Sequence, residues 1–173
     1  MHKIWILALL LALLTACTSK DEKALMKSYE KEKTYHKMLL KSEKTQLYDG
    51  QYTKAVLTAT YVSKQKIDKN EKFDEKFIIG VYLEDSNGTS FIKDGYTLTL
   101  NGVSPKSIST LKKKDVKEKG ISFVSEWSHF YLVTFPYIEN KRFKLLFKST
   151  LYGKGELNFA KVAKYSFGKR AIF

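Results

Sequence analysis

The chain has 173 residues but only one cysteine, Cys17, so it can form no internal disulfide. Small exported domains often use disulfides to compensate for a limited core. Here the fold must depend on buried apolar side chains alone. A chain of this length is enough for one domain that buries roughly 68–70% of its unfolded surface.

Arginine is also scarce, because 29 of the 31 basic residues are lysine and only Arg142 and Arg170 are arginine. Nucleic-acid sites and bidentate phosphate sites favour arginine, so we predict no nucleic-acid partner. The formal net charge of +13 leaves two interpretations. It could attract anionic lipid or polysaccharide, or the lysines could simply cover a solvated surface, which the composition alone favours.

Motifs for catalysis are lacking as well. The sequence contains no Gly-x-Ser-x-Gly turn. Apart from His2 in the predicted leader, its histidines are His36 and His129, which lie far apart in sequence. Zinc sites need three or four clustered ligands. The acid pairs 74–75 and 84–85 flank predicted strands, and we interpret them as charged strand ends. We therefore predict no metal site, no cofactor and no enzymatic activity.

The first seventeen residues are the most informative part of the sequence. A basic start, an apolar run over residues 4–14 and a small residue before Cys17 are the parts of a secretory signal. Eleven residues at about 1.5 Å each cover roughly half of a ~30 Å hydrocarbon core. A polar stretch follows directly, so the run does not predict a transmembrane helix.

Residues Leu14-Thr15-Ala16-Cys17 resemble the lipobox of bacterial lipoproteins. The resemblance implies cleavage before Cys17, a diacylglycerol thioether on Cys17 and acylation of the new amino terminus, with membrane lipid as the first partner. In Gram-negative lipoproteins, Asp directly after the acylated cysteine often retains the protein in the inner membrane, and this chain has Thr18 there. The resemblance thus implies a lipid-anchored cell-envelope protein and, if the host is Gram-negative, one in the outer membrane facing the periplasm.

A helix is predicted directly after the anchor. Ser19-Lys20-Asp21-Glu22 has capping-box spacing, and no glycine or proline occurs before Gly50. We expect the helix to run to Tyr48 and to end at Asp49-Gly50. Its apolar stripe is thin, so it could stand free as a stalk or pack on the domain through Leu39, Leu40 and Leu47. This divides the chain into a signal peptide (1–16), an acylated N-terminus with a charged amphipathic helix (17–49) and a β-domain (50–173).

After Gly50 the apolar period changes to two, which is typical of strands. Segments with strand character, separated by turn signals such as Asn101-Gly102, are residues 51–62, 72–83, 96–100, 122–125, 128–135, 143–148 and 157–162. Seven or eight strands without a second long helix predict a mainly β fold. We expect an antiparallel, immunoglobulin-like β-sandwich behind one N-terminal helix.

Three short segments have more than one interpretation. Residues 112–120 hold five lysines and two acids and predict a solvated loop, with contact to lipid headgroups as the alternative. Residues 141–144, Lys-Arg-Phe-Lys, could bind sugars or headgroups but fit better as a basic strand edge that prevents edge-to-edge pairing. Asn87 begins an Asn-x-Thr acceptor in a predicted turn with Asp85 before it, which is either an N-glycosylation site or a turn with a chance acid.

The function that follows is binding rather than catalysis; an enzyme, the third hypothesis, would require a cleft with convergent polar groups, of which the sequence gives no sign. We expect a membrane-anchored cell-envelope lipoprotein whose β-sandwich is a protein-binding adaptor or accessory subunit, since sheet faces and edges suit such contacts. The alternative is binding of anionic envelope lipid or polysaccharide through a lysine-rich surface. Salt separates the two, because exposed charges are screened as ionic strength rises.

Overall fold

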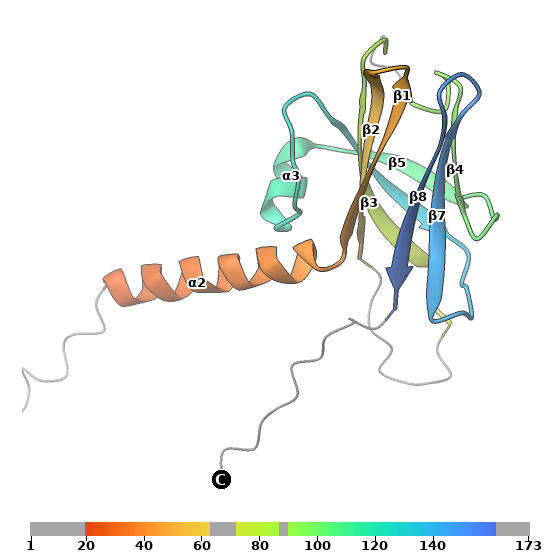
Figure 1. Cartoon of the computed structure of the whole chain (residues 1–173). Helices are drawn as coiled ribbons and strands as arrows, with labels where there is room; N and C mark the ends of the chain where they lie inside the picture. The colour runs from red at the N-terminus through yellow and green to blue at the C-terminus, as the bar shows by residue number, and fades with distance from the viewer. Residues whose placement is uncertain (1–19, 63–71, 87–89, 162–173) are drawn as a thin grey trace, which may run out of the picture. The chain divides into compact units, whose positions relative to one another are not determined.

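The computed structural model describes residues 20–62, 72–86 and 90–161 (Figure 1). The chain divides into two compact units between His36 and Lys37. The predicted leader, Cys17 and Asn87 lie outside the described residues. Over the described ranges, no helix has the length and apolar character needed to cross a bilayer.

Helix α2 (Lys20–Leu39) comes first, and it ends at Leu39 rather than at Tyr48 as predicted. Residues Ser42–Asp49 form strand β1 instead, so the β-domain starts before the predicted boundary at residue 50. Of the leucines expected to pack, Leu40 is 69% exposed. Leu47 is buried, but as part of β1.

The change from helix to strand has a local and a long-range cause. The Met38 carbonyl accepts hydrogen bonds from the Lys41 backbone at 3.0 Å and the Ser42 hydroxyl at 2.8 Å, which closes the last turn. Leu47 suits a helical stripe and an alternating strand equally well. Pairing of β1 with β2 (Tyr52–Tyr61) decides between them, because it brings Leu47 into the core at 2% exposure.

The predicted antiparallel β-sandwich is confirmed. One sheet has the order β1-β2-β3-β6-β5 and the other β4-β7-β8, and all pairs are antiparallel. The remaining bounds are β3 (Glu75–Leu83), β4 (Tyr96–Leu100), β5 (Ser107–Leu111), β6 (His129–Phe135), β7 (Arg142–Ser149) and β8 (Gly153–Ala160). Without β1, this order is that of immunoglobulin constant-type sandwiches, four strands facing three.

Aromatic rings fill the middle of the sandwich. Phe77 of β3 and Phe143 of β7 lie 5.9 Å apart between ring centroids, on the two strands that the inter-sheet disulfide joins in antibody domains. Phe77 also meets Tyr61 at 5.2 Å and Phe159 at 5.1 Å. Such edge-to-face and tilted pairs contribute about 0.5–1.5 kcal/mol each beyond their burial. They stabilise this disulfide-free core at the position where related architectures are cross-linked.

A smaller hydrophobic cluster lies on the other face of the five-stranded sheet. Ile78 and Phe130 point away from the main core and pack with Val116 and Ile121. Val116 belongs to a short helix, α3 (Lys113–Glu118), in the segment predicted as a solvated loop, so that prediction was wrong in part. Burial of Val116 at 0% exposure explains the helix, because it fixes the segment against the sheet.

In this region one predicted strand is absent and one observed strand was not predicted. Residues 122–125 lie in the loop after α3 and form no strand. Strand β5 was missed because Ser107–Leu111 has only two apolar residues, and it forms through pairing with β6 at the edge of the sheet.

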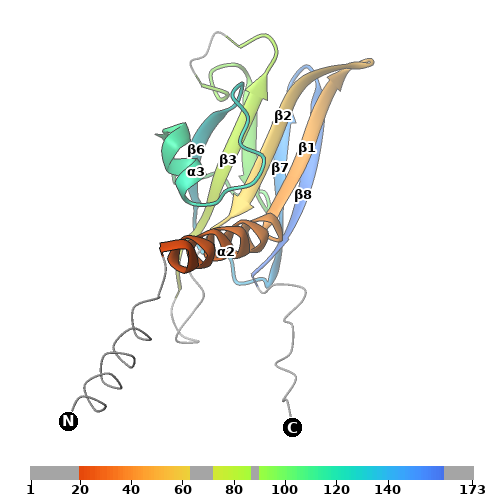
Figure 2. The same cartoon turned by 90° about the vertical axis from the view of Figure 1, so that its left-hand side faces the viewer.

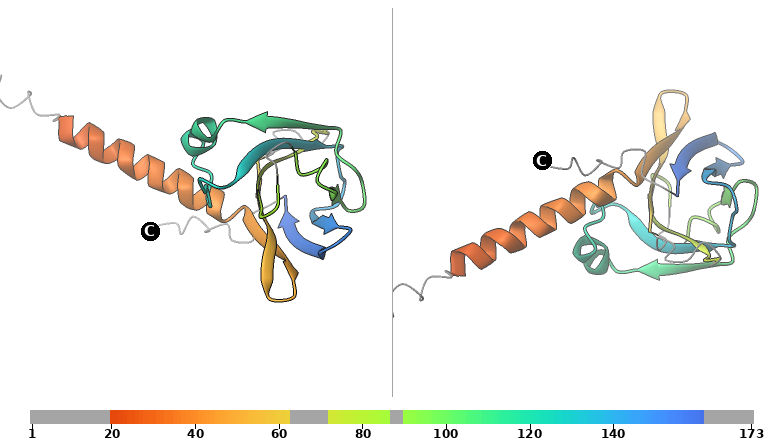
Figure 3. Two further views of the ribbon diagram at one scale, coloured as in Figure 1. Left: turned by 90° about the horizontal axis from the view of Figure 1, so that it is seen from above. Right: turned by 90° about the horizontal axis from the view of Figure 1, so that it is seen from below.

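The two sheets approach each other where β1 lies alongside β8 (Figures 2 and 3). A Cβ atom added to Gly155 of β8 would be 2.1 Å from the Thr45 Oγ1 atom of β1. Only glycine allows this approach. The two strands nevertheless belong to different sheets, so each is an edge strand.

Candidate functional site

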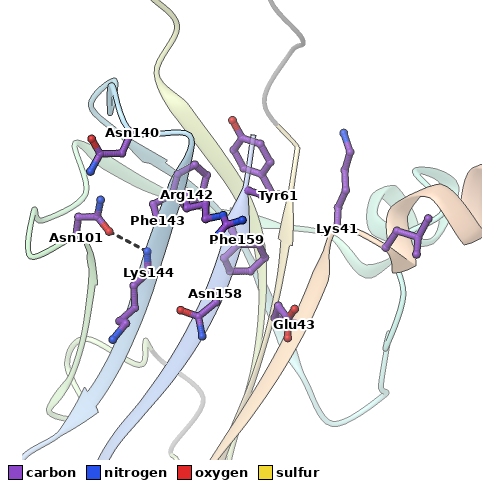
Figure 4. Close-up of a pocket in the computed structure, with 12 residues that line it drawn as sticks. Lys41, Glu43, Tyr61, Asn101, Asn140, Arg142, Phe143, Lys144, Asn158 and Phe159 are labelled. Carbon is purple, nitrogen blue, oxygen red and sulfur yellow. Dashed lines mark hydrogen bonds between the residues drawn. The ribbon is translucent and has the colours of Figure 1, made fainter. Parts of the chain in front are cut away.

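A groove of about 830 Å³ opens at one end of the seam between β1 and β8 (Figure 4). Its walls come from four strands and two turns of the β-domain. One wall consists of Lys41, just before β1, Glu43 of β1 and Tyr61 of β2. The opposite wall comes from β7, through Arg142, Phe143 and Lys144. Leu40, Asn101, Asn140, Asn158, Phe159 and Ala160 complete the lining.

The floor of the groove is apolar and fixed in place. Tyr61, Phe143 and Phe159 are 5%, 4% and 7% exposed. Their rings belong to the aromatic core, with Tyr61 and Phe143 at 5.2 Å and Phe143 and Phe159 stacked at 6.3 Å. Core rings are held by close packing. The groove therefore has a preformed base.

The rim of the groove is more positive than negative. Three cations, Lys41, Arg142 and Lys144, face one carboxylate, Glu43. Lys144 already pairs with Glu156 at 2.7 Å, which lowers the pKa of Glu156. Arg142 is exposed and forms no ion pair with the residues that the structure describes.

Burial and the nearby Lys37 lower the pKa of the Lys41 ammonium. Both effects penalise the charged form of Lys41, and an anion bound beside it would relieve them.

Three asparagine side chains add hydrogen-bonding groups around the groove. Asn101 is oriented by the strand beside it, because its Oδ1 atom accepts a hydrogen bond of 2.8 Å from the Lys144 backbone. Asn101 and Gly102 both have positive φ, 49° and 84°, as the predicted two-residue hairpin turn requires. Among the described residues the Nδ2 group of Asn101 has no acceptor, so it can donate to a ligand.

Behind the floor lies a buried polar network that sequence reasoning missed. The carboxylate of Glu75, 2% exposed, accepts a hydrogen bond of 2.6 Å from the Tyr61 hydroxyl and pairs with Lys161 at 2.6 Å. Lys161 also donates to the Ile138 carbonyl, and its ammonium lies 4.3 Å from the centroid of the Tyr137 ring. The network joins β2, β3 and the segments that follow β6 and β8, and it holds Tyr61 in position.

Glu75 is a charged strand end as predicted, the first residue of β3, but it is buried rather than at the surface. Its neighbour Asp74 pairs at the surface with Lys106 at 2.7 Å. Glu84 and Asp85 bind Lys54 at 2.8 and 3.2 Å, and these hydrogen bonds raise the pKa of Lys54. A buried carboxylate beside a surface one has no signature in sequence.

The other candidates from the sequence do not come together. His36 and His129 are both exposed, on α2 and β6. Across the described ranges, no three His, Cys, Asp or Glu side chains are grouped as metal ligands would be. Residues 141–144 were predicted as a strand edge, but β7 is the middle strand of its sheet, so that interpretation was wrong. Cys17 and Asn87 lie outside the described residues and stay predictions.

Comparison of the chain with protein-family models, with curated proteins and with solved structures found no match.

Proposed function

We propose that this chain is a lipid-anchored cell-envelope protein whose β-sandwich is a protein-binding adaptor, and that the groove beside β1 and β8 takes an extended, acidic segment of the partner. The observation that carries the proposal is the lining of the groove. It combines an aromatic floor, asparagine amides and a cationic rim between two sheet edges.

The position between two edges favours an extended peptide. Edge strands carry backbone N–H and C=O groups without a partner strand, and partner peptides often bind by adding to such an edge. Side chains that alternate along the peptide would contact the rings of Phe143 and Phe159 on one side and solvent on the other.

The excess of cations favours acidic residues in that peptide. Arg142 offers a planar fork that binds a carboxylate through two hydrogen bonds. Lys41 gains in its charged form from a nearby anion. Catalysis has no comparable support, because Glu75, the one buried carboxylate among the described residues, is engaged by Tyr61 and Lys161 behind the floor.

Site-specific photo-crosslinking in intact cells of the native host tests the proposal. A crosslinker at Asn158 in the groove should capture one protein, and the crosslinked peptide should be acidic. A crosslinker at Thr97, exposed on β4 and not part of the groove lining, is the control. Equal capture from both positions, or none from Asn158, would contradict the proposal.

Charge reversal on β7 gives an independent test. Arg142→Glu should weaken capture by on the order of tenfold, which is about 1.4 kcal/mol. Lys148→Glu changes the charge equally at another exposed position of the same strand and should leave capture unchanged. Capture that resists high salt would favour a protein partner over a purely electrostatic one.

Anchoring at Cys17 and glycosylation at Asn87 belong to the same proposal and are tested by mass spectrometry. Protein extracted from membranes should have the mass of residues 17–173 plus diacylglyceryl and acyl groups. An intact mass equal to the unprocessed, unmodified chain would refute the anchor. An unmodified peptide covering Asn87 from the native host would refute the glycan.

A further inference from the structure

Two large aromatic side chains project from the segment that returns from α3 to β6. Trp127 is 77% exposed and Phe123 is 46% exposed. Exposed lysines precede them in and beside α3: Lys112, Lys114 and Lys119. We call these five residues the α3 surface. It is separate from the groove, with which it shares no residue.

The segment that carries the α3 surface is firmly held. Val116 and Ile121 are buried against Ile78 and Phe130 of the five-stranded sheet. Glu126, next to Trp127, bonds Lys117 at 2.9 Å and lies 3.6 Å from Lys113, and these contacts lower the pKa of Glu126. The exposed aromatics therefore stand on a fixed support.

The backbone at Phe123 is unfavourable for the residue that occupies it. Its φ is 61°, in the left-handed region that favours glycine and asparagine. Strain of this kind persists where the surrounding structure imposes it, and it is concentrated at functional positions. Here it holds an aromatic ring that is 46% exposed to solvent.

The lysines in and beside α3 favour an anionic partner. Residues 112–127 hold five lysines and three acids, a net charge of +2. Glu126 pairs with both Lys113 and Lys117, whereas Lys112 and Lys119 have no ion-pair partner among the described residues. Lys114 is 3.9 Å from Glu118 and 83% exposed. Lysines attract the surface of anionic membranes, and tryptophan belongs to the aromatic residues enriched at the headgroup layer.

We propose that the α3 surface docks on an anionic phospholipid bilayer, with Trp127 and Phe123 at the headgroup layer and Lys112, Lys114 and Lys119 over the lipid phosphates. Docking would place the domain against the membrane through a second point besides any acyl chain. It requires neither the groove nor the predicted anchor at Cys17.

Tryptophan fluorescence gives a direct test, because Trp127 is the only tryptophan of the chain after residue 17. Residues 18–173, without leader or lipid, are mixed with vesicles of phosphatidylglycerol and phosphatidylcholine. Trp127 emission should shift to shorter wavelength and be quenched by brominated acyl chains. Pure phosphatidylcholine vesicles should give no shift.

Matched variants separate this surface from overall charge. The double change Lys112→Glu with Lys119→Glu should reduce vesicle binding by on the order of tenfold. Lys93→Glu with Lys148→Glu makes the same change of net charge at exposed positions of the other sheet and its loop. It should reduce binding much less, and circular dichroism verifies that both variants fold.

Removal of the strained ring tests the aromatic part. Phe123→Gly should fold normally but bind vesicles several-fold more weakly. Equal losses in both charge pairs, or no shift of Trp127 with anionic vesicles, would overturn the proposal. A shift with a soluble anionic polysaccharide but not with vesicles would overturn it too and assign the surface to a polymer.

Discussion

Substitution of Gly155 by alanine tests whether the two sheets really meet at β1 and β8. The new Cβ atom would lie 2.1 Å from Thr45 Oγ1, 2.8 Å from its Cγ2 and 3.0 Å from its Cβ. Gly155 has no positive φ, so alanine suits its backbone and would otherwise gain about 0.5 kcal/mol by restricting the unfolded chain. Overpacking costs typically about 1–3 kcal/mol. We expect Gly155→Ala to lower the free energy of unfolding by about 1.5 kcal/mol.

A double-mutant cycle isolates the contact. Thr45→Ala removes the two nearest atoms, so in the Gly155→Ala background it should restore about 1 kcal/mol relative to its effect alone. The assay is urea unfolding of residues 18–173 followed by Trp127 fluorescence. Gly153→Ala is the matched control on the same strand: its φ is 77° and nothing lies within 4 Å of the added Cβ.

The control should lose stability through backbone strain alone, and Thr45→Ala should not restore it. A neutral or stabilising Gly155→Ala, or a loss that Thr45→Ala leaves unchanged, would show that β1 and β8 are farther apart than the structure has them.

Three further predictions concern the core and the α3 surface. Glu75→Gln keeps an acceptor for the Tyr61 hydroxyl but leaves Lys161, 17% exposed, without its carboxylate. It should lower the free energy of unfolding in urea by about 3 kcal/mol, and a loss below about 1 kcal/mol would contradict the buried pair. Phe123→Gly should leave the stability unchanged or raise it by up to about 1 kcal/mol, because glycine accepts its φ freely, and clear destabilisation would contradict a strained ring. Burial raises the pKa of Tyr96 and of Tyr131, so their contribution to stability is complete below pH 10 and is lost as pH rises through the raised values. Tyr96→Phe should therefore move the midpoint of alkaline unfolding to higher pH, and an unchanged midpoint would count against the burial.

Much of the fold could be predicted from the sequence because strands buried on one face alternate. The alternation in residues 72–83 and 143–148 correctly predicted that Phe77 and Phe143 point into the core, because every second side chain of these strands is buried there. Leu47 misled the prediction because one apolar residue among polar ones fits both periods. Its assignment depends on pairing with β2, which the local pattern does not encode.

The groove could not be predicted, and the reason is geometric. Lys41 and Arg142 are about a hundred positions apart in sequence, and they share a groove only because the sheets meet at β1 and β8. The exposed position of Trp127 was equally hidden, because burial of Val116 and Ile121 fixes the segment that carries it. The lysines of residues 112–119 could be read from the sequence, but the packing that holds this segment against the sheet could not.

The small cluster under α3 also has a consequence for how the domain opens. Residues 77–81 of β3 are buried on both faces, between the aromatic core and the cluster of Ile78. Amide hydrogens there can exchange with solvent only when both layers separate, so their exchange should report global unfolding. Edge strand β5, with no fully buried residue, should exchange through local fluctuations. The domain thus has a slow-exchanging spine in β3 and a faster-exchanging edge in β5.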